Sequence, residues 1–217
     1  MNLSFEEARD TYWKYYISLE KQFLETERYV EFDYINNGKT YSMEFMKLFQ
    51  AVCSEIDVVG KKLAQISNEA FSPNKKTGIN EWWFYITKNY PDFSERKCIL
   101  LGRKVLQPWK RFDVIENPNE NAKKFILNER SKPKGQTPSW WNDYNSVKHN
   151  RTGTYKENVS NYTKANLQNL FSSFAALYLL EVALMEKTYF QEDNFSCAEL
   201  RSSLFRDDCP FYCVVSQ

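Results

Sequence analysis

The sequence predicts a mainly all-α protein, an up-and-down bundle of about four main helices with an irregular insertion at 92–136. Apolar residues recur at steps of three and four in two long segments, and a near-continuous apolar segment lies toward the C-terminus. Glycine and proline lie mostly outside these segments. At 217 residues the chain fits a single domain, 1–217, in which 92–136 is the insertion and 189–217 a C-terminal appendage.

The first two helices are predicted from their caps and their apolar stripes. Ser4 and Glu7 form a capping-box pattern that opens a helix from about 5 to 28. The segment 30–41 breaks the pattern, and Asn36-Asn37-Gly38 indicates a turn within it. A second helix follows at about 42–67, because its apolar residues share one face: Phe45, Phe49, Val52, Ile56, Val59 and Leu63.

The later elements are shorter until the last helix. A short helix is expected at 81–89, ended by Pro91, and short strands at 98–101 and 103–106 within the insertion. Thr137 as N-cap and Pro138 as first helical residue predict a helix that ends near Asn150. The apolar helix from about 159 to 188 should lie at the centre of the bundle, with a short helix at 197–205 in the tail.

Composition predicts a cytoplasmic protein without a membrane span. The N-terminus has no basic and apolar signal pattern, and the apolar stretch 170–185 is shorter than the ~20 residues that a bilayer requires. Five cysteines, an odd number at irregular spacing, indicate a reducing compartment. Cys209 and Cys213 lack a second pair of ligands, so we expect neither a metal nor another cofactor.

Positive charge is concentrated in the middle of the chain. Residues 94–151 carry 13 basic and 6 acidic side chains, a net charge of +7, whereas 1–93 (11 basic, 14 acidic) and 152–217 (5 basic, 8 acidic) each carry −3. The whole chain is near neutral at +1. A basic segment of this kind is either a solvated surface or a site for an anionic ligand.

Three sequence patterns of enzymes are excluded. Asn37-Gly38-Lys39-Thr40 resembles the end of a phosphate-binding loop, but Asp33 stands where that loop needs another glycine, so a turn is the better interpretation. The sequence contains neither a dinucleotide-binding glycine fingerprint nor a nucleophile elbow.

The predicted helix around His149, the only histidine, has two different faces. At ~100° per residue, Trp140, Tyr144 and Val147 share one side, which suits the core. Asn142, Asn145 and His149 lie on the opposite side, and Trp141 shares a third flank with Lys148.

The polar face suits chemistry on RNA. His149 could move a proton near neutral pH, Asn145 could orient the imidazole ring, and Lys148 and Arg151 could hold a phosphate. Together they would suit cleavage of RNA without a metal, in which cations stabilise the charged phosphorane. The alternative is that His149 is an ordinary surface residue of a polar helix face.

The run Tyr144-Asn145-Ser146-Val147-Lys148-His149, followed by a long apolar helix, resembles the HEPN superfamily. Its members are all-α bundles found in bacterial toxin–antitoxin, phage-defence and CRISPR systems, and many are RNases that pair two Arg-polar-x(n)-His motifs across a dimer. The resemblance implies that His149 is catalytic and that Asn145 is the polar residue of the motif. The sequence departs from the motif at Tyr144, which stands in the arginine position and cannot supply a guanidinium.

Two hypotheses follow. In the first, the chain is an endoribonuclease with His149 and Asn145 as catalytic residues, and Lys148, Arg151 and Asn142 as phosphate or RNA ligands. In the second, the bundle is catalytically inactive and binds RNA, a nucleotide or a partner protein such as an antitoxin. A homodimer that joins two copies of His149 favours the first hypothesis, and an isolated His149 favours the second.

Overall fold

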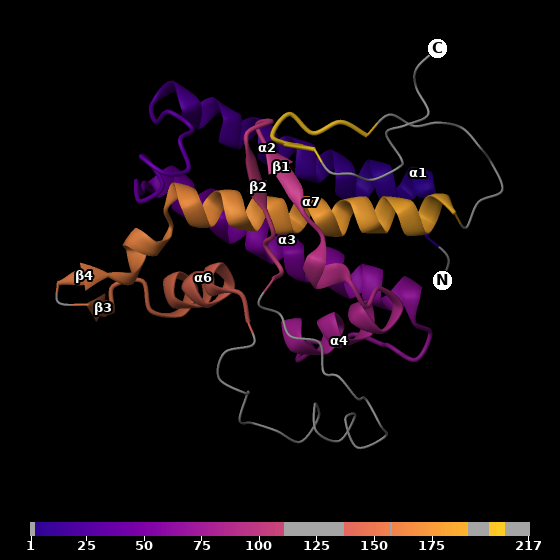
Figure 1. Cartoon of the computed structure of the whole chain (residues 1–217). Helices are drawn as coiled ribbons and strands as arrows, with labels where there is room; N and C mark the ends of the chain where they lie inside the picture. The colour runs from indigo at the N-terminus through magenta and orange to yellow at the C-terminus, as the bar shows by residue number, and fades with distance from the viewer. Residues whose placement is uncertain (1–2, 111–136, 157, 191–199, 207–217) are drawn as a thin grey trace, which may run out of the picture.

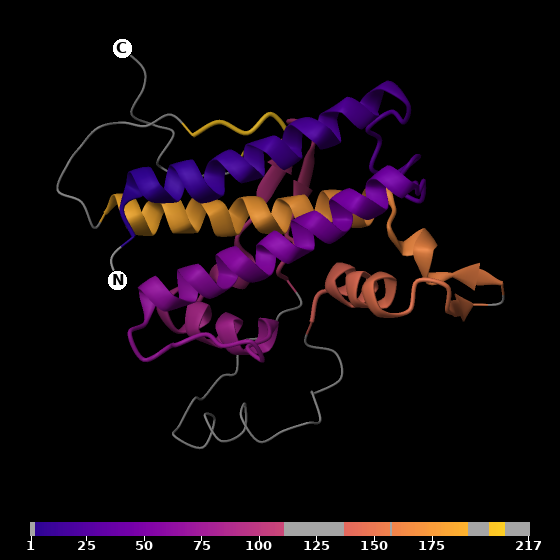
Figure 2. The ribbon, with the colours of Figure 1, turned by 180° about the vertical axis from the view of Figure 1, so that it is seen from behind.

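The mainly helical fold is confirmed by a computed structural model that describes residues 3–110, 137–156, 158–190 and 200–206. Its longest helices are α2 (Lys14–Glu25), α3 (Met43–Ser67) and α7 (Leu167–Tyr189). All three pack against one another, and α3 crosses α7 at an angle in both views (Figures 1 and 2). α7 contacts α1, α2, α3 and α6. These contacts leave no place at which the described helices divide into two domains.

The predicted N-terminal helix is one helical run with a π-helical turn inside it. It contains α1 (Phe5–Ala8), the π-helix η1 (Arg9–Trp13), α2 and the 3₁₀ turn η2 (Thr26–Arg28). The capping box is confirmed: the Glu7 amide donates to Ser4 Oγ, and the Ser4 amide donates to a Glu7 carboxylate oxygen, both at 3.1 Å. The sequence did not predict the π-turn, which inserts one extra residue and rotates the preceding helix turn.

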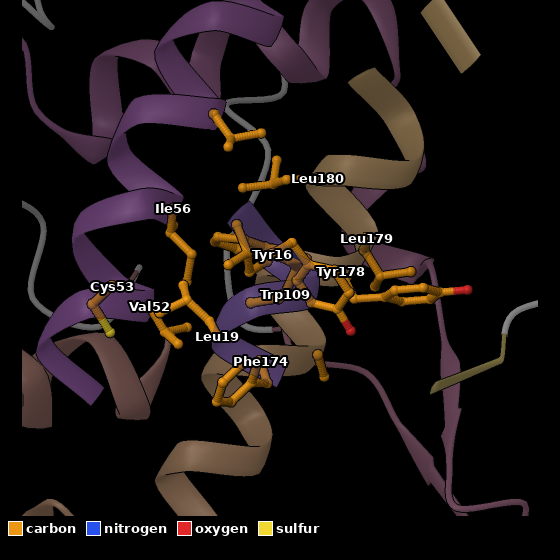
Figure 3. Packing of buried hydrophobic residues seen from close by; sticks show 14 of the residues in the cluster. Tyr16, Leu19, Val52, Cys53, Ile56, Trp109, Phe174, Tyr178, Leu179 and Leu180 are labelled. Atoms are coloured by element: carbon orange, nitrogen blue, oxygen red, sulfur yellow. The ribbon is translucent and has the colours of Figure 1, made fainter. Parts of the chain in front are cut away.

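The core lies where α2, α3 and α7 meet. Leu19, Val52, Ile56 and Phe174 converge there (Figure 3), and the last three are fully buried. The ring of Phe23 stacks on Phe174 at 4.9 Å between centroids with an interplanar angle of 6°. The stripe predicted for 42–67 is buried throughout, because it faces α7 on one side and α4 on the other.

Two shorter helices, α4 (Ile79–Asn89) and α6 (Ser139–His149), pack on the other side of α3 from α2 (Figure 2). The predicted start of α6 was one residue early. Pro138, with ψ of 144°, is the N-cap rather than the first helical residue. Thr137 does not cap the helix through its amides, because its hydroxyl donates instead to Asn142 Oδ1 at 2.7 Å.

The start predicted for the last helix, about 159, is wrong. The helix begins at Leu167 because the side chain of Asn166 caps it, accepting from the Asn169 amide at 3.0 Å. The residues before it form the antiparallel hairpin of β3 (Thr154–Lys156) and β4 (Val159–Ser160), then the 3₁₀ turn η4 (Asn161–Lys164). This hairpin projects from the end of the bundle next to α6 (Figure 1).

The short strands predicted in the insertion are confirmed as β1 (Cys98–Leu100) and β2 (Lys104–Leu106), which follow the 3₁₀ turn η3 (Phe93–Glu95). β1 also pairs with β5 (Phe205–Arg206). The short helix predicted at 197–205 is therefore wrong for its described part, since 200–204 is not helical and β5 follows. The rest of the insertion, 111–136, lies outside the described residues.

α7 is long and apolar enough to cross a membrane by length and composition, but 83% of its most apolar window is buried inside the protein. A core helix accounts for that burial. Of the five cysteines, Cys53 and Cys98 are described, and both are buried. Cys197, Cys209 and Cys213 lie outside the described residues.

Candidate functional site

α6 presents the two faces that its sequence predicts. Trp140, Tyr144 and Val147 are buried, and the Tyr144 ring meets Phe49 of α3 edge-on at 6.0 Å. Trp140 is fixed further by its indole N–H, which donates to the carbonyl oxygen of Pro108 at 3.0 Å. The buried face therefore anchors α6 to α3 and to the chain just after β2.

The opposite face of α6 points away from the core. Asn142 and His149 are exposed and Asn145 is half-buried. The Asn142 side chain is already hydrogen-bonded to Thr137. Its Oδ1 accepts from the Thr137 hydroxyl, and its Nδ2 donates to the Thr137 carbonyl oxygen at 3.3 Å. Within the described part of the chain, neither Asn145 nor His149 forms a side-chain hydrogen bond or an ion pair. The His149 imidazole therefore has no orienting partner among the residues that the structure describes.

The two predicted cations lie on other flanks. The Lys148 ammonium is 5.4 Å from the centroid of the Tyr144 ring, so it leans toward α3 rather than toward His149. Arg151 follows the end of α6, and its carbonyl oxygen accepts from the Tyr162 amide at 3.1 Å. The structure thus keeps the predicted face of α6 but does not gather the five predicted residues in one hollow.

A polar pocket of about 830 Å³ lies on the neighbouring flank of α6. It is bounded by α6, the β3–β4 hairpin, the start of α7 and the turn at 38–41. Three lysines and two tyrosines line it with a single carboxylate, and the remaining lining side chains are mostly amides and hydroxyls: Lys39, Tyr41, Asp143, Tyr155, Lys156, Asn158, Val159, Ser160, Thr163, Lys164, Asn166 and Asn169. We call this the lysine pocket.

Of the three lysines in the lysine pocket, Lys164 is held by the most side chains. Its ammonium donates to Ser146 Oγ at 3.1 Å, lies 3.3 Å from Asp143 Oδ1 and sits 4.6 Å from the centroid of the Tyr155 ring. Asn169 Nδ2 donates to the other Asp143 oxygen at 2.9 Å. These contacts hold a half-buried cation between α6 and the hairpin, with Asp143 as its counter-charge.

The other two lysines are less restrained. Lys39 donates to Gln168 Oε1 at 2.9 Å and is exposed, as is Lys156 on β3. Neither is in an ion pair within the described residues. Among the lining residues that the structure describes, three lysines against Asp143 give a net charge of +2. That balance favours an anion over a metal ion.

The turn at 38–41 is what brings Lys39 to the pocket. A Cβ on Gly38 would collide with the carbonyl oxygen of Tyr34, so only glycine fits there. The carbonyl oxygens of Gly38 and Thr40 accept from the amides of Gln168 and Leu167, each at 2.9 Å. The first amides of α7 are therefore already used, and an anion in the pocket would meet side chains rather than the helix terminus.

Tyr41 and Tyr155 give the lysine pocket two partly open aromatic faces, with exposed fractions of 47% and 46%. The Tyr41 ring forms an edge-to-face contact with the Tyr162 ring at 5.4 Å between centroids. The backbone of Asn158 has φ of 57° at the tip of the hairpin, a conformation that asparagine adopts more readily than most residues. The hairpin turn thus folds Tyr155 back over Lys164.

The sequence did not predict the lysine pocket. Its lysines come from the two segments that carry a net charge of −3, not from the basic middle of the chain. The turn at Asn37-Gly38 was predicted, and it is confirmed by the bond from the Thr40 amide to the Asn37 carbonyl oxygen at 2.9 Å. Nothing in the spacing indicated that this turn would face the start of α7.

Comparison with protein-family models, with curated proteins and with solved structures found no match to this chain. Among the described residues, no three His, Cys, Asp or Glu side chains lie together in a way that could hold a metal ion. A proposal for the function of this chain therefore depends on the side chains of α6 and of the lysine pocket.

Proposed function

We propose that this chain binds a phosphate-bearing ligand of the nucleotide or RNA class in the lysine pocket, and that it does so without cutting RNA. The observation that supports this most directly is the lining of the pocket, where Lys39, Lys156 and Lys164 stand beside the open rings of Tyr41 and Tyr155. An anion that also carries an aromatic base matches both features.

Each part of such a ligand has a partner in the pocket. Lysine ammonium groups bind phosphate oxygens through charge-assisted hydrogen bonds. A base stacked on a tyrosine ring contributes about 1–3 kcal/mol by the usual effect of alanine substitution. The side-chain amide of Asn158, an exposed residue of the pocket lining, supplies a donor and an acceptor for base edges. The volume of about 830 Å³ is within the range of small-ligand sites.

The surroundings of Tyr144 support binding rather than cleavage. This residue occupies the arginine position of the HEPN-like motif and is only 5% exposed, packed between α6 and α3. A guanidinium at that place would be buried, so it could not face a substrate together with His149. The kinship with the HEPN superfamily stays a proposal, and the defence or toxin-type pathway that it implies is part of that proposal.

Binding is tested by fluorescence anisotropy on the full chain with a labelled single-stranded RNA, with ATP and inorganic phosphate as competitors. We expect Lys164→Ala to weaken binding about tenfold and to reduce the slope of log K against log salt by about 1, because one phosphate contact is lost. Competition by ATP at low concentration assigns the site to nucleotides, and failure of ATP to compete assigns it to RNA.

Lys47→Ala is the matched control, since Lys47 is an exposed lysine of α3 that pairs only with Glu44 at 2.9 Å. It should bind as the wild type does. If a Lys39→Ala and Lys164→Ala double variant binds RNA, ATP and phosphate as tightly as the wild type, the lysine pocket is not the binding site.

A second candidate function is RNA cleavage by a homodimer through His149. It is favoured by one observation: His149 is exposed on the outer face of α6, where a second copy could approach it. Purified protein would be incubated with RNA beside His149→Ala, and its mass in solution measured. Cleavage by a dimer that His149→Ala abolishes supports this function, and equal activity in both proteins excludes it.

A further inference from the structure

The core holds two buried glutamates in opposite circumstances. Glu20 of α2 is 2% exposed, and its carboxylate accepts from the Tyr16 hydroxyl at 2.7 Å, from the Ser203 amide at 2.8 Å and from the hydroxyl of Ser202. Glu181 of α7 is 0% exposed, and neither of its carboxyl oxygens has a hydrogen-bond partner among the described residues. Hydrogen bonds account for the burial of Glu20, whereas no contact among the described residues accounts for the burial of Glu181.

An ionised carboxylate in this position would cost several kcal/mol, because it has lost water and gained no donor. The group avoids the cost by keeping its proton. Burial, with the nearby charge of Glu55 as a second cause, raises the pKa of Glu181 well above its ordinary value. No lysine or arginine of the described residues pairs with either glutamate.

Glu181 has two acidic neighbours on other elements. Glu55 of α3 is half-buried, and its desolvation raises its pKa to about 6. Tyr12 of η1 is also half-buried, and burial, then Glu55, then Glu181 raise its pKa. Three elements thus contribute one acidic group each, and the group on α7 is the most deeply buried of the three.

The π-turn lies at the same place. η1 contains Tyr12, and both α1 and η1 pack on α7. A π-turn costs hydrogen-bond geometry and is often found at functional sites. Here it contains Tyr12, on which the charges of Glu55 and Glu181 act.

We infer that Glu181 and Glu55 form a proton-binding site, and that release of its proton weakens the packing of α1 and η1 on α3 and α7. The direction follows from linkage. The folded state holds these protons more tightly than the unfolded state, so the stabilisation is complete below the unfolded pKa of 4.5 and is lost as pH rises through the folded pKa of about 6 of Glu55 and beyond. The opening of the N-terminal helical run is therefore linked to pH near neutrality.

The test is hydrogen exchange of the amides of residues 5–13 between pH 5 and pH 8, corrected for intrinsic exchange, together with urea unfolding at each pH. In the wild type we expect protection to fall with rising pH, by about tenfold for each unit by which the pKa is raised. Glu181→Gln imitates the protonated acid in shape and cannot ionise. Its protection should lose the part of the pH dependence that Glu181 contributes and keep only the part that comes from Glu55.

Glu55→Gln removes the repelling neighbour, so it should show a smaller pH dependence than the wild type, and it provides the comparison should Glu181→Gln not fold. Glu44→Gln, an exposed glutamate of the same helix, is the control and should keep the wild-type slope. A wild-type protein whose protection does not change between pH 5 and pH 8 overturns the inference. So does a Glu181→Gln or Glu55→Gln protein that keeps the full slope.

Discussion

The Lys164 ammonium lies 3.3 Å from Oδ1 of Asp143, and this contact joins the 3₁₀ turn before α7 to the flank of α6. It is an ion pair inside a pocket where two other lysines have no counter-charge among the described residues. Asp143 therefore has two opposite effects on an anionic ligand: it orients Lys164 and it cancels one positive charge of the lysine pocket.

Replacing Asp143 by asparagine separates these effects. Asparagine keeps an oxygen for Lys164 but removes the negative charge, so we expect the affinity for RNA or nucleotide to rise several-fold and its salt dependence to steepen. Anisotropy titrations at two salt concentrations measure both. Asp143→Glu keeps the charge and is the control. Weaker binding in Asp143→Asn would contradict an anion site in this pocket.

Glu20 should be essential for the attachment of the 200–206 segment to α2. Glu20→Ala leaves the Ser203 amide without its acceptor and leaves the Leu204 amide only Ser202 Oγ at 3.2 Å, and we expect a loss of about 3 kcal/mol in the free energy of unfolding. Urea unfolding measures the loss, and limited proteolysis measures the release of the segment. Tyr16→Phe removes the hydroxyl that contacts Glu20 and Ser202 but keeps the carboxylate that accepts from the segment, so its cost should be smaller, about 1 kcal/mol. Equal costs for the two variants would show that the carboxylate does not fix this segment.

Gly60 should not tolerate a side chain. A Cβ at this position would lie 2.8 Å from ring atoms of Trp82, which is fully buried and donates its indole N–H to Asp57 at 2.9 Å. We expect Gly60→Ala to lower the free energy of unfolding by about 1–3 kcal/mol through overpacking. Gly78→Ala is the matched control, because a Cβ there meets no atom within 4 Å. A thermal or urea melt compares them, and similar stabilities would argue against the close packing of α3 on α4.

Glu181→Met should stabilise the protein. It replaces an unpartnered buried carboxyl by an apolar side chain of similar length, and we expect a gain of about 1–3 kcal/mol at pH 7. The gain should be larger at pH 8 than at pH 5, since Glu55 ionises in both proteins but only the wild type loses stability as Glu181 approaches ionisation. Urea unfolding at the three pH values measures this. A loss of stability at every pH would mean that the carboxyl has a structural partner.

Local signals in the sequence determined most of the helices. The capping box at Ser4 and the apolar stripe from Phe45 to Leu63 each act within one element, so their positions are confirmed. The two faces of α6 followed for the same reason, since burial on one side and exposure on the other depend only on helical spacing. The start of α7 was missed because its apolar composition hid a cap, at Asn166, that follows a short hairpin.

Tertiary structure alone decided where charged groups meet. Lys39 and Lys164 are more than a hundred residues apart, and they line one pocket because the Gly38 turn docks on the first amides of α7. Glu55 and Glu181 become neighbours because α3 packs along α7, and the missing partner of Glu181 is a property of that packing. The sequence by itself determined that His149 lies on an open helix face. It could not determine which side chains surround that face, because electrostatic contacts depend on distances that only the folded chain sets.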